Sequence, residues 1–156
     1  MSLNIEPFAR YLHTELELTT ALHQLLVQEL DVLKQQQLEE LKALQPQKQQ
    51  LLQDIQACAE QRLGWMTEHQ LPHSPDCLEH PDIVNSGEIQ PLWQQLASQY
   101  DANRHLSETL SDLVLKARYR TQQKLQILRG GNNDPHLYNE HGKTKGVNSG
   151  QGYVQA

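Results

Sequence analysis

The side chains best suited to chemistry gather in one short stretch of the chain. His69, His73, Cys77 and His80 lie within 12 residues, and imidazole and thiolate are ligands that Zn²⁺ prefers. Their spacing matches no specific zinc pattern, and the prolines between them limit how the loop can close around an ion. A solvated polar loop in a chain with eight histidines is the simpler interpretation. We therefore expect no metal and no other cofactor.

The sequence offers little for nucleophilic catalysis. Cys58 lies on an apolar stripe between Ile55 and Met66, which favours a small buried hydrophobe over a reactive thiol. We find no Ser/His/Asp set, no paired buried carboxylates and no nucleotide-binding loop on the expected helices. Gly130 and Gly131 follow a helix rather than precede one, so they do not form a phosphate loop. We predict that the protein is not an enzyme.

The composition predicts an all-α fold. Leucine supplies 26 residues and glutamine 22, while β-branched and aromatic residues are scarce. Leucines at helical spacing predict helices over about residues 4–36, 38–69 and 91–129, and the prolines of residues 70–90 predict a connecting loop. Pro46 either begins a new helix or kinks a continuous one.

These helices suit a long three-helix antiparallel bundle, or a helical hairpin plus a long C-terminal helix. The helical domain is expected to span residues 1–131. Residues 132–156 are rich in Gly, Asn, Lys, Ser and Gln, which predicts a flexible, disordered tail. Trp65 and Trp93 flank the loop and are expected to pack at one end of the bundle.

The charge pattern favours a solvated helix face over a nucleic-acid site. The net charge is −6, yet residues 104–129 carry six Lys and Arg against Glu108 and Asp112. No aromatic stacking platform or groove-reading motif accompanies these bases, so we expect no nucleic-acid partner. The sequence shows no signal peptide and no apolar run near the ~20 residues that span a membrane, so a cytoplasmic location is expected.

Three stretches of the chain form a recognisable succession. The second predicted helix has leucines and a lysine at regular spacing, the third predicted helix ends in a polar run with leucines, and a leucine-tyrosine element follows with a glycine four residues after the tyrosine. The segments are Leu41-Lys42-Ala43-Leu44 with Lys48 and Leu51-Leu52, then Arg120-Thr121-Gln122-Gln123-Lys124-Leu125-Gln126-Ile127-Leu128, then Leu137-Tyr138-Asn139-Glu140-His141-Gly142. In order and spacing, over about residues 5–142, they resemble the family of flagellar export chaperones called FlgN.

The resemblance implies a cytoplasmic chaperone for the two hook–filament junction proteins, FlgK and FlgL. Such a chaperone binds their C-terminal segments, prevents premature assembly and delivers them to the type III export gate protein FlhA. Its contact with the membrane is indirect, through the export apparatus. The family's gate-docking tyrosine corresponds to Tyr138, with Gly142 completing the element.

We expect the client to bind a leucine stripe on the third helix, although at least half of that stripe must pack against the first two helices. The predicted surface comprises Leu106, Leu110, Leu113, Ala117, Leu125 and Leu128. Arg118, Arg120 and Lys124 lie at its rim, where cations can steer acidic client segments. Two alternatives stay open. One is a self-associating coiled-coil scaffold, against which the phase breaks near Gln35, Pro46 and Gln70 argue. The other is a zinc-binding helical protein that uses the His69–His80 loop.

Overall fold

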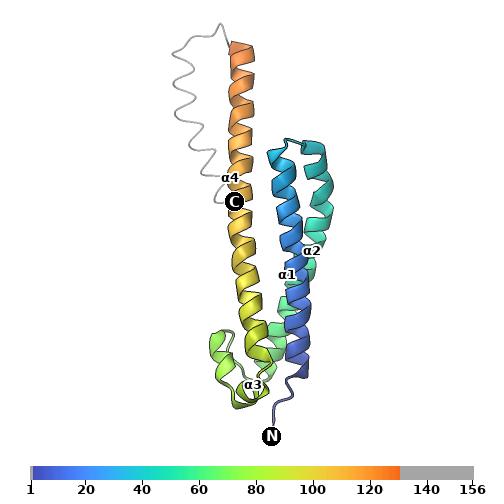
Figure 1. Ribbon diagram of the computed structural model, residues 1–156, viewed down its shortest axis with the longest axis vertical. Coiled ribbons are helices and arrows are strands. Elements are labelled where there is room, and N and C mark those ends of the chain that lie inside the picture. Colours follow the sequence, from blue (N-terminus) through green and yellow to red (C-terminus); the bar gives the residue numbers. More distant parts are fainter. Residues whose placement is uncertain (1, 131–156) are drawn as a thin grey trace. The chain divides into compact units, whose positions relative to one another are not determined.

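A computed structural model describes residues 2–130 of the chain, and all regular elements in that range are helical. The elements are α1 (Glu6–Lys34), α2 (Leu38–Glu68), the short 3-10 helix η1 (Pro75–Glu79), α3 (Pro81–Ser86) and α4 (Ile89–Gly130) (Figure 1). The all-α prediction is confirmed. The chain divides into two compact units, residues 1–110 and residues 111–156, with α4 running through the boundary.

Helices α1 and α2 form an antiparallel hairpin with a tight reversal at its tip (Figure 1). Gln36 has a φ of 59°, and the N–H of Gln37 donates to the carbonyl of Val32 at 3.1 Å, so the chain turns back within three residues. Pro46 lies inside α2, which continues through it. The missing N–H of Pro46 therefore costs one backbone hydrogen bond without dividing the helix.

The segment expected as a plain loop at residues 70–90 is instead largely helical. Pro75 and Pro81 occupy first-turn positions of η1 and α3, where a fixed φ and an absent N–H favour helix initiation. Ser74 caps η1 by accepting the N–H of Asp76 at 3.3 Å. Gly87, with a φ of 66°, ends α3. Pro75 and Pro81 therefore begin helices here, because a proline's position within the turn decides its effect.

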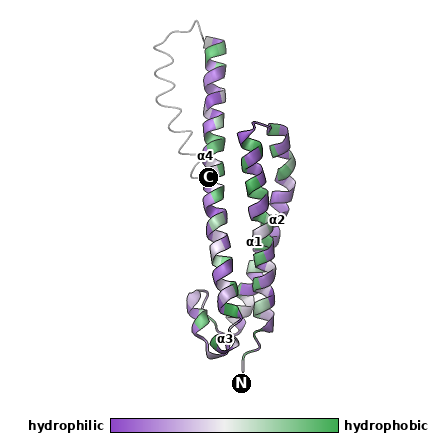
Figure 2. Ribbon diagram, viewed as in Figure 1, coloured by the Kyte–Doolittle hydropathy of each residue, from purple (hydrophilic) through white to green (hydrophobic). Residues whose placement is uncertain are grey.

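Two apolar clusters hold the first unit together. Hydrophobic and hydrophilic positions alternate along the ribbons of the helices, as expected where each helix buries one side (Figure 2). The base cluster joins the lower hairpin, the η1–α3 segment and the start of α4. The upper cluster joins the hairpin to later residues of α4. The base cluster has Phe8, Ala9, Leu12, Trp65, Met66, Leu71, Cys77, Ile83, Ile89, Leu92 and Leu96 at its centre. The upper cluster has Leu22, Leu26, Ile55 and Leu110, with Leu18, Leu30, Leu33, Leu51 and Leu106 packed against them.

Aromatic rings close the base of the bundle. Phe8 stacks on Trp65 with ring centroids 5.1 Å apart, and it meets the edge of Trp93 at 6.3 Å. The expectation that both tryptophans pack at one end of the bundle is confirmed. Among the described helices, none is both long enough and apolar enough to cross a membrane.

Candidate functional site

The first two residues of the predicted client surface lie inside the bundle. Leu110 is 5% exposed and belongs to the upper cluster, where Leu22 and Leu26 of α1 and Ile55 of α2 surround it. Leu106 is partly buried against the same cluster. These two leucines are therefore occupied by contacts with the hairpin.

The other four predicted surface residues lie in the second unit. Leu113 and Ala117 are of intermediate burial. Leu125 is 45% exposed and Leu128 is 80% exposed, which leaves large apolar side chains in contact with water. The stripe that the sequence presents as continuous is thus divided between buried and exposed members.

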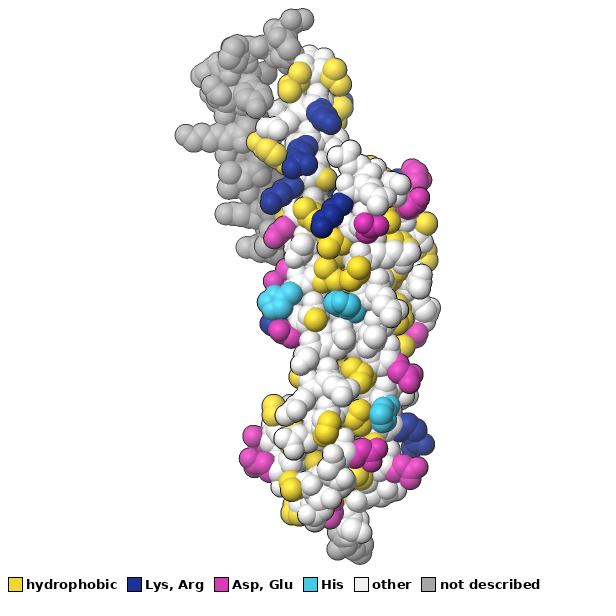
Figure 3. Space-filling model, in the orientation of Figure 1, with side chains coloured by type: hydrophobic (Ala, Val, Ile, Leu, Met, Phe, Trp, Pro, Cys, Tyr) yellow, Lys and Arg dark blue, Asp and Glu magenta, His cyan; other side chains and the backbone are white. Residues whose placement is uncertain are grey.

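Residues 111–130 also concentrate positive charge. This segment carries five Lys or Arg and one Asp, whereas residues 1–110 carry six Lys or Arg and sixteen Asp or Glu, giving formal charges of +4 and −10. Lys and Arg side chains lie beside apolar ones over the end of α4 (Figure 3). Tyr119 and Ile127, which the predicted surface omitted, are 57% and 70% exposed. We call residues 111–130 the cationic segment.

Between the two apolar clusters, a buried carboxylate joins three helices. Glu15 of α1 is fully buried and accepts hydrogen bonds from Nε (2.7 Å) and a terminal nitrogen (3.3 Å) of Arg62 in α2. The hydroxyl of Tyr100 in α4 donates to the second carboxylate oxygen. Burial, followed by the bond to Glu15, raises the pKa of Tyr100. The guanidinium of Arg62 also lies 5.7 Å from the ring centroid of Trp93.

About one helical turn further along α4, the side-chain amide of Asn103 makes further hydrogen bonds to α1. Asn103 of α4 is 5% exposed, and its Nδ2 donates to the carbonyl of Thr19 at 2.9 Å. Its Oδ1 lies 2.9 Å from Nδ1 of His23 and accepts from Gln99 at 3.1 Å. Thr19 is itself fully buried, and its hydroxyl donates back to the carbonyl of Glu15.

We call these side chains the polar layer: Glu15, Thr19, His23, Arg62, Tyr100 and Asn103. Both oxygens of Glu15 are engaged by donors, so the carboxylate is not offered to a substrate. A buried charge held in this way acts as a structural contact that fixes helix register. The sequence contains a signal for this layer, because polar residues replace leucines at buried positions of both α1 and α4 where the two helices meet.

The residues considered for zinc have other partners. The His69 ring stacks on Trp65 with centroids 4.3 Å apart, and Nε2 of His73 lies 2.8 Å from the hydroxyl of Thr67. Cys77 is 1% exposed, and Nδ1 of His80 accepts the N–H of Asp82 at the start of α3. Within residues 2–130, no group of three His, Cys, Asp or Glu side chains is placed to hold a metal ion.

The predicted gate-docking residues Tyr138 and Gly142 lie outside the described residues. Comparison of the sequence with known proteins includes both residues. No curated protein and no solved structure matches the chain. A family model described as FlgN protein matches residues 1–146, which is nearly the whole chain. The three resembling segments and the long-helix fold agree with that match, and the chain belongs to the FlgN family.

Proposed function

We propose that this protein is a cytoplasmic, non-enzymatic export chaperone for the hook–filament junction proteins FlgK and FlgL. It binds their C-terminal segments, prevents premature assembly and delivers them to the type III export gate. Family membership supports the chaperone role. The observation that carries the binding role is the end of α4, where large apolar side chains are exposed among cations.

The cationic segment suits an amphipathic helix as its client. Leu125 and Leu128 offer apolar area that helix-in-groove packing buries. Lys116, Lys124 and Arg129 accelerate encounter with an acidic segment and fix its orientation. A client segment that is disordered when free pays an ordering cost on binding, so its affinity stays moderate and release at the gate is possible.

Delivery depends on the element around Tyr138 and Gly142. By resemblance to the family, Tyr138 docks on the gate protein FlhA. An exposed tyrosine supplies a large, rigid contact area at low conformational cost. Replacing Tyr138 by alanine is expected to abolish gate binding while leaving client binding intact.

Calorimetric titration tests this proposal. Full-length FlgK and FlgL are expected to bind saturably, and versions that lack the C-terminal segment are expected not to bind. The double substitution Leu125→Ala/Leu128→Ala should weaken binding about tenfold or more, because two exposed anchors lose their contacts. Val84→Ala is the matched control, since Val84 is 61% exposed on α3, away from the cationic segment in sequence. Absence of binding to either full-length protein would reject the chaperone assignment.

A further inference from the structure

The polar layer separates two contacts of unequal size between α4 and the hairpin. Below the layer, Ile89, Leu92 and Leu96 are buried in the base cluster, and Trp93 packs against it. Above the layer, within residues 104–110, the upper cluster takes two side chains, Leu106 and Leu110. The start of α4 is therefore held by more apolar burial than the turns that follow the layer.

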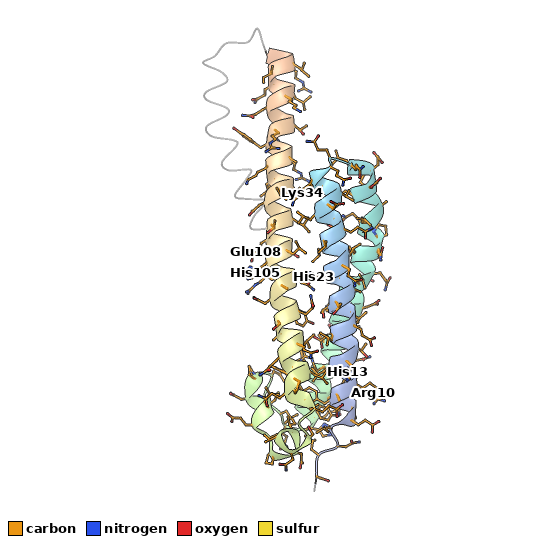
Figure 4. The ribbon with its side chains drawn as sticks, in the orientation of Figure 1. Arg10, His13, His23, Lys34, His105 and Glu108 are labelled. Carbon is orange, nitrogen blue, oxygen red and sulfur yellow. The ribbon has the colours of Figure 1, made fainter. Side chains whose placement is uncertain are left out.

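The other side chains of residues 104–110 make no hydrogen bond or ion pair with the hairpin. His105 and Glu108 are exposed and project from the side of α4 away from α1 (Figure 4). Arg104 pairs with Asp101 at 2.6 Å, but both residues are on α4 and both side chains are more than half exposed. Thr109 donates to the carbonyl of His105 in the same helix.

The apolar face of the hairpin above the polar layer is longer than the stretch that these two leucines cover. On α1 it comprises Leu22, Leu26, Leu30 and Leu33, a span of about 17 Å at ~1.5 Å per residue, whereas Leu106 and Leu110 are one helical turn apart. Leu51 and Ile55 of α2 complete the face. It already seats an amphipathic helix whose apolar side chains recur every four residues, so its shape suits another helix of that pattern.

The polar layer also sets where α4 can separate from the hairpin. Separating α4 at the layer breaks the hydrogen bonds of Tyr100 with Glu15 and of Asn103 with Thr19, and each lost bond costs free energy. Moving Leu106 and Leu110 away from the hairpin breaks apolar contacts but no hydrogen bond or ion pair between residues 104–110 and the hairpin. Opening above Asn103 is therefore less costly than opening below it.

We propose that α4 opens above the polar layer and that a helix of the client takes the place of Leu106 and Leu110 on the hairpin. This inference rests on the proposed chaperone function and adds a second surface to the exposed end of α4. The client helix has aliphatic side chains three or four residues apart over about three turns, matching the length of the hairpin face above the polar layer. The polar layer stays closed, and it marks the end of the hairpin surface that the client helix can cover.

The direction in which single substitutions change the affinity for the client tests this exchange. Leu110→Ala weakens the closed state, so a larger fraction of the protein is open and the affinity for the client's C-terminal segment rises, by about three- to tenfold. Leu26→Ala removes a side chain on which both Leu110 and the client helix pack, so it is not expected to raise the affinity as Leu110→Ala does. Leu96→Ala, the same truncation in the base cluster, leaves affinity within about twofold of wild type. Circular dichroism confirms folding, and Leu110→Val replaces Leu110→Ala if the latter unfolds.

Hydrogen exchange gives an independent readout on the wild-type protein. On binding, amides of residues 104–110 are expected to lose protection, those of residues 92–100 to keep it, and those of residues 22–33 to gain it. Lower or unchanged affinity of Leu110→Ala, with residues 104–110 still protected, would overturn the exchange while leaving the chaperone function standing. A wild-type protein that binds neither client would instead reject the proposed function itself.

Discussion

The carboxylate of Glu15 in α1 accepts a hydrogen bond from the hydroxyl of Tyr100 in α4, although the two residues are 85 positions apart. Thr19 and Asn103 meet one turn further along with a separation of 84. A nearly constant separation means that α1 and this part of α4 run parallel. The hydrogen bonds favour that register, because a shift of α4 by one turn separates Glu15 from Tyr100 and Thr19 from Asn103.

Removing the cation of the polar layer is expected to destabilise the protein strongly. Arg62→Met leaves the fully buried Glu15 without its ion pair, at a cost of about 3–5 kcal/mol in the free energy of unfolding. The double substitution Glu15→Leu/Arg62→Met removes both charges and should recover most of that loss. Urea denaturation of the two single variants and the double variant measures the coupling. Additive losses would contradict a paired buried charge.

The stability of the protein should also fall at alkaline pH because of Tyr100. Its pKa is raised in the folded state by burial and by Glu15, with Arg62 acting in the opposite direction. The folded state therefore holds the phenolic proton more tightly than the unfolded state, where the pKa is about 10. This contribution is complete below about pH 10 and is lost as the pH rises beyond it.

Comparison with Tyr100→Phe isolates that effect from other titrating groups. The variant is expected to be less stable than wild type by about 1–2 kcal/mol at pH 7, since a hydrogen bond to a charged group is lost. Measured by urea denaturation between pH 7 and pH 10.5, the difference should shrink at the highest values. A difference that stays constant across the whole range would show that the hydroxyl does not keep its proton through Glu15.

The sequence predicted the helices well because their signals are local. Leucine spacing marks α1, α2 and α4 through side chains that each helix buries along one stripe. The η1–α3 segment was missed because Pro75 and Pro81 were read as breaks rather than as first-turn residues. Burial of Leu71 and Ile83 depends on the base cluster, which forms only when distant segments meet.

The polar layer could not be predicted from either helix alone. Glu15 and Thr19 are buried between Leu12 and Leu22 on α1, and on α4 the apolar stripe is interrupted by the buried Asn103 and by Tyr100, which is 37% exposed. Each lapse by itself is an ordinary polar position. The polar residues of α1 meet those of α4 only because the two helices run parallel in this register. That register depends on tertiary packing, which neither helix sequence shows alone.

Both cysteines are expected to be unreactive until the protein unfolds. Burial, with a contribution from Asp76 and against that of Arg62, raises the pKa of Cys77 to about 11. The thiol of Cys58 is also buried, with a raised pKa, and it donates to the carbonyl of Tyr11. At pH 8, a chromogenic disulfide reagent should titrate two thiols rapidly in denaturant and react with the native protein far more slowly. Rapid native reaction of either thiol would contradict its burial.

Client binding should depend on salt through the cationic segment. Lys124 and Arg129 lie in a stretch of formal charge +4, so raising the ionic strength from 0.05 to 0.5 M, on the order of a threefold shorter screening length, should slow association with an acidic client. Lys124→Glu/Arg129→Glu should slow it further and flatten the salt dependence, with a smaller effect on dissociation. Lys42→Glu is the control, because Lys42 is an exposed cation on α2 outside this segment. Stopped-flow association rates measure both effects, and equal slowing by Lys42→Glu would indicate that net charge, rather than the cationic segment, guides the encounter.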